Sequence, residues 1–177
     1  SDAAGNNSDC TSFSATYELD ETAPTAPTDV TLTDPSSQPG LDTTPTFAVD
    51  GLTIGNGIRL YSDSSCTAEV GSGAASSSTT SVDTNPLVSD GTYSIYATTI
   101  DPAGNESACS SNFDTYVLDA SAPTLTSVQI EGSGGESTVG VNGDAILTFV
   151  ANEPLKTHAV TIIGQTAAVT NPYGLTY

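Results

Sequence analysis

Two short segments carry oxygen-bearing side chains whose types and spacing suit a cation site. Asp101-Pro-Ala-Gly-Asn105 reads as a tight turn between the last two strands of a β-sandwich, and Asp20 and Glu21 enter at the same pole of that sandwich. Carboxylate and amide oxygens that converge from two segments suit a hard cation such as Ca²⁺. The alternative is a plain turn, in which Asp and Asn form local hydrogen bonds and Gly supplies a positive φ.

A second candidate cation site follows at the next junction. There Asp119 pairs with Glu153, which we expect in the loop after a strand of the following domain. Asp2 and Asn6 repeat the first motif, and we expect the other half of their site to lie upstream of this chain. At each junction the expected cofactor is structural Ca²⁺, which also neutralises carboxylates that would otherwise repel one another.

The three cysteines, Cys10, Cys66 and Cys109, lack the close spacing of a zinc site. Cys66 and Cys109 fall within one repeat of the sequence, whereas Cys10 is the repeat equivalent of Cys109. One disulfide per domain explains the odd count, and it predicts a bond between Cys66 and Cys109 of the kind found in secreted proteins. The alternative is a pair of buried free thiols.

The sequence offers little for catalysis. His158 is the single histidine, no serine lies in a Gly-x-Ser-x-Gly elbow, and aromatic residues make up only 6% of a chain without Trp. Carboxylates are plentiful, but nothing indicates the aromatic-lined cleft in which a pair of them would act as acid and base. We therefore expect that the protein is not an enzyme.

Net charge narrows the set of partners. The 177-residue chain has 21 acidic side chains and two basic ones, Arg59 and Lys156, which gives a formal charge of −19. This balance argues against nucleic acid and against anionic membrane surfaces, because both are bound through clusters of Lys and Arg. No apolar run is long enough to cross a bilayer, so we expect no direct membrane insertion.

An internal repeat organises these residues into domains. Residues 2–25 and 101–124 align without a gap at a spacing of 99, and 14 of the 24 positions are identical. A repeat of this length predicts tandem domains, each about the size of one immunoglobulin-like sandwich. We assign residues 1–20 to the last strand of a preceding domain, 21–119 to a complete domain, and 120–177 to the first part of a following domain of another subtype. We therefore expect the chain to be a segment of a longer protein.

Short strands separated by turns fill the complete domain. Val30-Thr31-Leu32 and Tyr93-Ser94-Ile95 alternate apolar and polar residues, and Pro, Gly, Asn, Asp and Ser punctuate the strands. No window has a useful helical period. We expect an all-β fold of tandem immunoglobulin-like β-sandwiches with about seven antiparallel strands each. The strands of the complete domain are predicted near 28–33, 44–49, 57–62, 68–72, 78–84, 92–99 and 109–118.

Four phrases in a fixed order carry a family resemblance. They are Leu60-Tyr-Ser-Asp-Ser-Ser-Cys66, Asp90-Gly-Thr-Tyr93, Asp101-Pro-Ala-Gly-Asn-Glu-Ser107 and Leu118-Asp-Ala-Ser-Ala-Pro-Thr124. Through them, residues 21–119 resemble the bacterial immunoglobulin-like domains repeated in giant adhesins and other large surface proteins. The phrases Ala145-Ile-Leu-Thr-Phe149 and Asn152-Glu-Pro-Leu155 resemble a different subtype of the same class. The resemblance implies junctions that hold calcium on linker aspartates. The phrase Asp90-Gly-Thr-Tyr93 also resembles a tyrosine corner.

The resulting functional expectation is structural. We expect a stalk or spacer of a secreted or cell-surface repeat protein, such as a bacterial adhesin, with domain junctions rigidified by calcium. Its partners are the neighbouring immunoglobulin-like repeats of the same chain, and identical chains if a fibre forms. One alternative is a subunit of an extracellular filament or sheath that is completed by strands from a neighbour. Another is a module that binds glycans or proteins through its loops.

Overall fold

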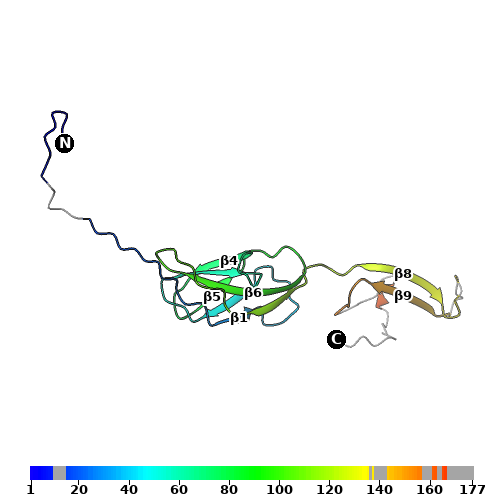
Figure 1. Ribbon diagram of the computed structural model, residues 1–177. Helices are drawn as coiled ribbons and strands as arrows, with labels where there is room; N and C mark the ends of the chain where they lie inside the picture. The colour runs from blue at the N-terminus through cyan, green and yellow to red at the C-terminus, as the bar shows by residue number, and fades with distance from the viewer. Residues whose placement is uncertain (10–14, 136, 138–142, 157–160, 163–164, 167–177) are drawn as a thin grey trace. The chain divides into compact units, whose positions relative to one another are not determined.

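The computed structural model describes every residue except 10–14, 136, 138–142, 157–160, 163–164 and 167–177 (Figure 1). The chain divides into two compact units, Ser1–Ala120 and Ser121–Tyr177. In the described residues strands and turns make up both units. This part of the chain contains no helix that could cross a membrane. The prediction of an all-β fold is confirmed.

Seven strands of the first unit form two antiparallel sheets. One sheet has the strand order β1-β2-β5, and the other has the order β4-β3-β6-β7. Each strand overlaps one of the seven that the sequence predicted, because alternation and turn residues mark them clearly. The strands are β1 (Asp29–Asp34), β2 (Thr46–Asp50), β3 (Gly57–Tyr61), β4 (Glu69–Ala74), β5 (Thr79–Asp83), β6 (Gly91–Ile100) and β7 (Asp114–Leu118).

The core lies between these two sheets, as in a β-sandwich. Alternate residues along a strand point to the same face, so β2 and β3 each bury an apolar row, Phe47 with Val49 and Ile58 with Leu60. The largest side chains of this core are Phe47 from β2, Ile58 and Leu60 from β3, Ile95 from β6, and Tyr116 and Leu118 from β7. Both sheets therefore contribute to one hydrophobic cluster, and the sandwich is held together by its own residues.

The chain enters the sandwich at one end of β6 and leaves it at the other. Just after β6 ends, the Asn105 side-chain amide donates to the backbone oxygen of Asp20 over 3.0 Å. Just before β6 begins, Asp90 accepts a hydrogen bond of 2.7 Å from the backbone nitrogen of Ala120. We call these the entry end and the exit end. Because β6 has ten residues, they are separated by about 33 Å of extended strand.

The second unit contains β8 (Leu125–Gly132) and β9 (Ala145–Ala151), paired antiparallel, and the short pair β10 (Thr161–Ile162) and β11 (Gln165–Thr166). Five apolar side chains of β8 and β9 are more than half exposed: Leu125, Val128, Ile130, Ile146 and Val150. A two-stranded sheet alone buries little apolar surface. The assignment of residues 120–177 to the first part of a following domain stays a prediction.

Candidate functional site

The carboxylate of Asp101 organises a turn directly after β6. Its Oδ1 accepts from the backbone nitrogen of Asn105 over 2.8 Å, and its Oδ2 accepts from the Asn105 side-chain amide over 2.9 Å. Gly104 adopts a φ of 95°, which favours glycine, and its nitrogen donates to the Asp101 backbone oxygen. The Asn105 amide, followed by backbone donors of the turn, lowers the pKa of the Asp101 carboxyl. A fixed, ionised acid therefore stands at the entry end.

The linker meets this turn through its backbone. The Asn105 amide nitrogen bridges Asp101 Oδ2 and the backbone oxygen of Asp20. The Asp20 carboxylate accepts instead from the backbone nitrogen of Thr22 over 3.0 Å, and Glu21 is exposed. The structure thus brings Asp101, Asn105 and the Asp20 carbonyl together. The Asp101 carboxylate and the Asp20 carbonyl oxygen face one another across the NH₂ group of Asn105. A cation bound between these two oxygens would take the place of that NH₂ group.

The first copy of the repeat forms the same turn. Asp2 accepts from the backbone nitrogen and the side-chain amide of Asn6, each over 3.0 Å, and Gly5 has a φ of 89°. The Asn6 amide again contributes most to lowering the pKa of the acid. In the described part of the chain no strand pairs with residues 2–6. The turn is therefore encoded by its own five residues, which supports the plain-turn alternative for its hydrogen bonds.

The two acids predicted at the next junction lie in different units. Asp119 closes the first unit, where its backbone nitrogen donates to the Gly40 oxygen over 2.9 Å. Glu153 follows β9 in the second unit, and its Oε1 is buried without a hydrogen-bond partner among the described residues. Across those residues, no three His, Cys, Asp or Glu side chains gather in a group that could hold a metal ion. Calcium at both junctions stays a prediction.

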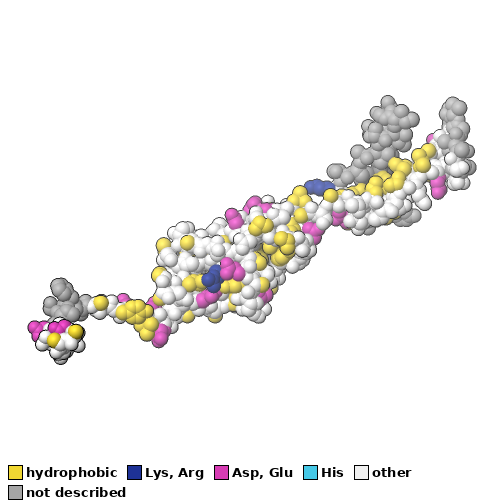
Figure 2. Space-filling view, turned by 90° about the horizontal axis from the view of Figure 1, so that it is seen from above, with side chains coloured by type: hydrophobic (Ala, Val, Ile, Leu, Met, Phe, Trp, Pro, Cys, Tyr) yellow, Lys and Arg dark blue, Asp and Glu magenta, His cyan; other side chains and the backbone are white. Residues whose placement is uncertain are grey.

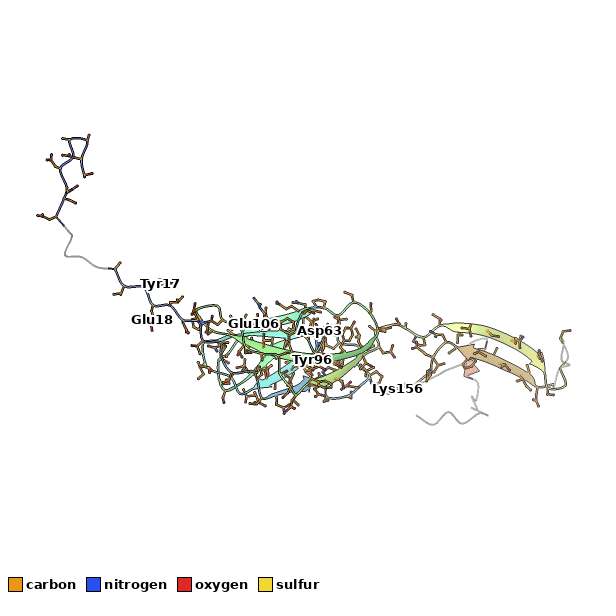
Figure 3. All side chains as sticks on the ribbon, in the orientation of Figure 1. Tyr17, Glu18, Asp63, Tyr96, Glu106 and Lys156 are labelled. Carbon is orange, nitrogen blue, oxygen red and sulfur yellow. A yellow bond between two sulfur atoms is a disulfide. The ribbon has the colours of Figure 1, made fainter. Side chains whose placement is uncertain are left out.

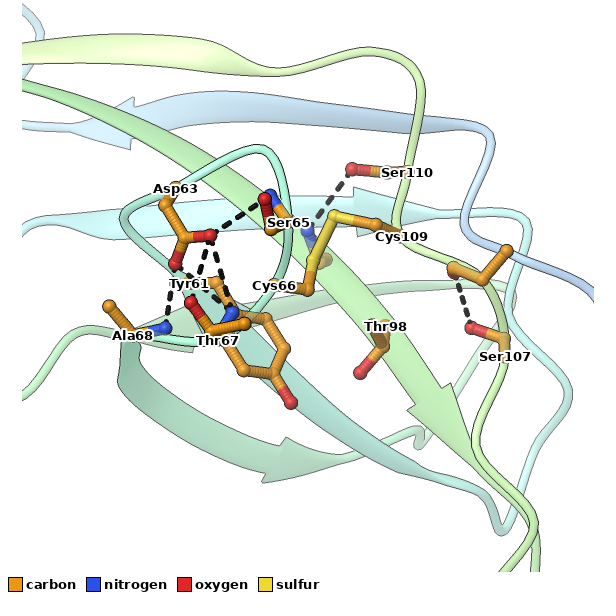
Figure 4. The surroundings of a disulfide bond; sticks show 12 residues. Tyr61, Asp63, Ser65, Cys66, Thr67, Ala68, Thr98, Ser107, Cys109 and Ser110 are labelled. Carbon is orange, nitrogen blue, oxygen red and sulfur yellow. Dashed lines mark hydrogen bonds between the residues drawn. A yellow bond between two sulfur atoms is a disulfide. The ribbon is translucent and has the colours of Figure 1, made fainter.

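The structure contains the disulfide that the repeat predicted, between Cys66 and Cys109 (Figure 4). Cys66 lies in the loop after β3, and the two Cα atoms are 5.8 Å apart. The Asp63 carboxylate shapes this loop, because it accepts from the backbone nitrogens of Ser65 over 2.9 Å and Ala68 over 2.6 Å. These bonds, Ala68 first, lower the pKa of Asp63. Cys10 lies outside the described residues, as does His158.

Cys109 lies between two serines that form hydrogen bonds with β6 in the way a neighbouring strand would. The Ser107 and Ser110 backbone nitrogens donate to Thr99 and Ala97 oxygens of β6, each over 2.9 Å. Their hydroxyl oxygens accept from the Thr99 and Ala97 nitrogens over 3.0 and 3.1 Å. The last strand, predicted from residue 109, therefore begins only at Asp114, since serine side chains replace part of the backbone ladder. Sequence alternation does not reveal this substitution.

A polar cluster on the outer face of the larger sheet was not predicted. Glu106 Oε1 accepts from the Tyr61 hydroxyl over 2.7 Å and the Thr98 hydroxyl over 2.6 Å, and its Oε2 lies 3.2 Å from Arg59 Nη1. Arg59 and Thr98 are direct partners in the β3–β6 pairing. Arg59 and Thr98 are far apart in the sequence, and the register of β3 against β6 is what brings them together. Elsewhere on the visible surface acidic side chains are scattered rather than gathered (Figure 2).

Glu106→Gln is expected to weaken the response of the sandwich to acid. Hydrogen bonds from Thr98 and Tyr61, and then the charge of Arg59, lower the pKa of Glu106. A carboxyl whose pKa is lower in the folded state stabilises above its unfolded pKa, and that contribution disappears as pH falls through the folded value. Urea unfolding between about pH 7 and 3 should give a shallower acid slope for the variant than for wild type. Parallel curves would contradict this, and Glu69→Gln is the matched control.

The tyrosine corner suggested by the resemblance has the expected contact. The Tyr93 hydroxyl donates to the backbone oxygen of Ser89 over 2.7 Å. The phenol at the start of β6 thus bonds back to the loop before it.

Comparison with known proteins adds no relative, since no protein-family model, curated protein or solved structure matches the chain. A functional proposal therefore depends on the repeat and on the geometry of the sandwich.

Proposed function

We propose that the chain is part of the stalk of a secreted or cell-surface repeat protein, in which immunoglobulin-like sandwiches act as spacers joined end to end. The observation that carries this proposal is the path of the chain. It enters the sandwich beside Asn105 and leaves beside Asp90, at opposite ends of β6. Each added unit of this kind extends an array by at least the length of that strand.

The repeat supports the same reading. The turn that meets the entering linker recurs 99 residues earlier with the same hydrogen bonds. A turn that is repeated in sequence and in its hydrogen bonds at the spacing of one domain suits a linear array, in which each unit contacts only its neighbours. The Cys66–Cys109 disulfide fits an oxidising compartment outside the cytosol. The resemblance to repeats of large bacterial surface proteins supports an adhesin as the protein to which the stalk belongs.

The proposed location at the cell surface can be tested on intact cells. Antibodies raised against residues 21–119 should label intact, unpermeabilised cells of the source organism, and protease added outside those cells should remove the label. Labelling only after permeabilisation would overturn the proposal. A cytosolic control protein must stay unlabelled in the same preparation.

Calcium is the proposed stiffener of the entry end, held by Asp101, Asn105 and the Asp20 carbonyl. These groups supply fewer than the about six to eight oxygen ligands that Ca²⁺ takes, so binding should be weak, with Kd on the order of 0.1–1 mM. The charge of −19 favours cation uptake. At about a hundred times Kd, binding to the folded state alone would add roughly 2.7 kcal/mol.

Asp101→Ala is expected to abolish any rise in melting temperature that calcium produces and chelator reverses. Asp2→Ala is the matched control, because Asp2 forms the same turn where no sandwich of the described chain adjoins it. Calorimetry of wild type and both variants, with calcium and then with chelator, measures the difference. If chelator leaves the wild-type melting temperature unchanged, these acids are ordinary turn residues and the calcium part of the proposal fails.

A further inference from the structure

The first and last segments of the sandwich lie side by side and run in the same direction. β7 points toward the exit end, because its last residue pairs with Gly91. The chain after β1 follows the same course: the Leu32 nitrogen donates to the Asp114 carboxylate over 2.9 Å, and Gly40 forms a parallel bridge with Leu118. The segment that enters at one end thus contacts the segment that leaves at the other.

A row of hydrogen bonds, which we call the parallel contact, joins these two segments. Gln38 replaces a stretch of backbone in it, since its amide nitrogen donates to the Thr115 oxygen over 2.9 Å and its oxygen accepts from the Val117 nitrogen over 2.8 Å. Further along, the Gly40 nitrogen donates to the Val117 oxygen over 3.0 Å, and the Gly40 oxygen accepts from the Asp119 nitrogen over 2.9 Å. The row therefore extends to the last residue before the chain leaves.

The parallel contact is also closely packed. A Cβ at Gly40 would lie 2.6 Å from the Tyr116 hydroxyl oxygen, so glycine permits this approach of the two segments. The Tyr116 hydroxyl donates to the backbone oxygen of Asp42 over 2.7 Å, and its ring is fully buried. Hydrogen bonds along the contact and a buried ring across it hold the two segments together.

Tension along an array would pull these two segments in opposite directions, one past Asn105 and the other past Asp90. They can be freed by two routes, because either β1 slides off β2 or β7 slides off β6. Residues 32–40 separate from β7 in both routes, so the parallel contact must break in either one. Its bonds lie beside one another along the direction of pull, and they therefore carry the load together.

We propose that the parallel contact is a mechanical clamp, which sets the rate at which the sandwich unfolds when it is pulled between its entry and exit ends. The inference rests on the proposed stalk for its use, because an array that spans a distance transmits tension through each unit. The two can fail separately. Tandem units that do not lengthen would refute the stalk, whereas the clamp is measured on a single sandwich.

The test is single-molecule pulling of the full 177-residue chain between its two ends at constant force. The first unit is identified as the event that lengthens after dithiothreitol, since the Cys66–Cys109 bond otherwise withholds the residues between them from extension. We expect Gln38→Ala to raise its unfolding rate about tenfold or more, because two hydrogen bonds that break on the way to unfolding are lost. An unchanged rate would overturn the proposal.

Glu106→Ala is the matched control, since one side chain again loses two short hydrogen bonds. Those bonds join the segment after β6 to Tyr61 and Thr98 within the larger sheet (Figure 3). We expect this variant to lower the urea midpoint, yet to change the unfolding rate under tension by less than about threefold, because its contacts persist when the parallel contact breaks. Equal acceleration by Gln38→Ala and Glu106→Ala would show that general stability, and no clamp, sets the rate.

The direction of pull gives a second measurement that needs no weakened clamp. Val88 is exposed just before β6, and a handle on Val88→Cys, in a chain with Cys10→Ala, allows pulling between position 88 and the C-terminus. This direction separates β6 from β7 at the exit end, so the bonds of the parallel contact break one after another from Asp119 backward. We expect the first unit to give way at a lower force than between the two chain ends. An equal or higher force would overturn the proposal.

Discussion

Tyr116→Ala is expected to destabilise the first unit by roughly 3–5 kcal/mol, the range for removing a large buried aromatic side chain. Tyr116 is fully buried, and its ring packs in the cluster that joins the two sheets. The substitution also leaves the Asp42 oxygen without its 2.7 Å hydrogen bond. Urea unfolding monitored by circular dichroism measures the free-energy change.

Two companion substitutions separate the causes. Tyr116→Phe retains the ring and removes only the hydroxyl, so the loss should be about 1 kcal/mol. Tyr17→Ala changes the repeat-equivalent residue, which is exposed, and should alter stability by less than about 0.5 kcal/mol. Equal losses at positions 17 and 116 would contradict the assignment of the core.

Replacing both Cys66 and Cys109 by Ala is expected to cost roughly 3–4 kcal/mol of unfolding free energy. The bridge closes a loop with a sequence separation of 43 residues, and cross-linking a loop of that length removes considerable entropy from the unfolded chain. For a domain of this size the melting temperature should fall by about 15 °C or more. Calorimetry of the variant against wild type provides the measurement.

Cys10→Ala is the control for that comparison, because it leaves the bridge intact and should leave the melting temperature unchanged. Reduction of the wild-type chain with dithiothreitol should reproduce the loss seen in the double variant. A double variant that melts within about 3 °C of wild type would show that the bridge adds little to the sandwich.

The strands could be predicted from the sequence because local signals agree with the fold in this domain. Alternation at Val30 and Tyr93 and the turn residues between strands mark elements that the two sheets then pair. The disulfide followed from counting cysteines per repeat, without geometry. The start of β7 did not follow, because Ser107 and Ser110 use their hydroxyls in place of a regular ladder.

The site was predictable only in part, and for a physical reason. Asp101 and Asn105 meet because the turn is local, so sequence spacing alone fixes their contact. Glu106 was missed because its partners lie on β3 and β6, and their proximity depends on strand register. Tyr17 and Tyr116 make the same point, since each follows a Thr and lies two residues before a Leu, yet one is exposed and the other is buried. Tertiary context decides whether such a segment becomes a strand.

The spacer account is tested most directly by the length of tandem units. Small-angle scattering of chains that contain one, two and three copies of residues 21–119, in millimolar calcium, measures the maximum dimension. The account predicts a constant increase of at least about 33 Å per copy, the length of β6 between the entry and exit ends. An increase that is much smaller, or that shrinks with each copy, would mean that the units fold back on one another and would contradict the stalk.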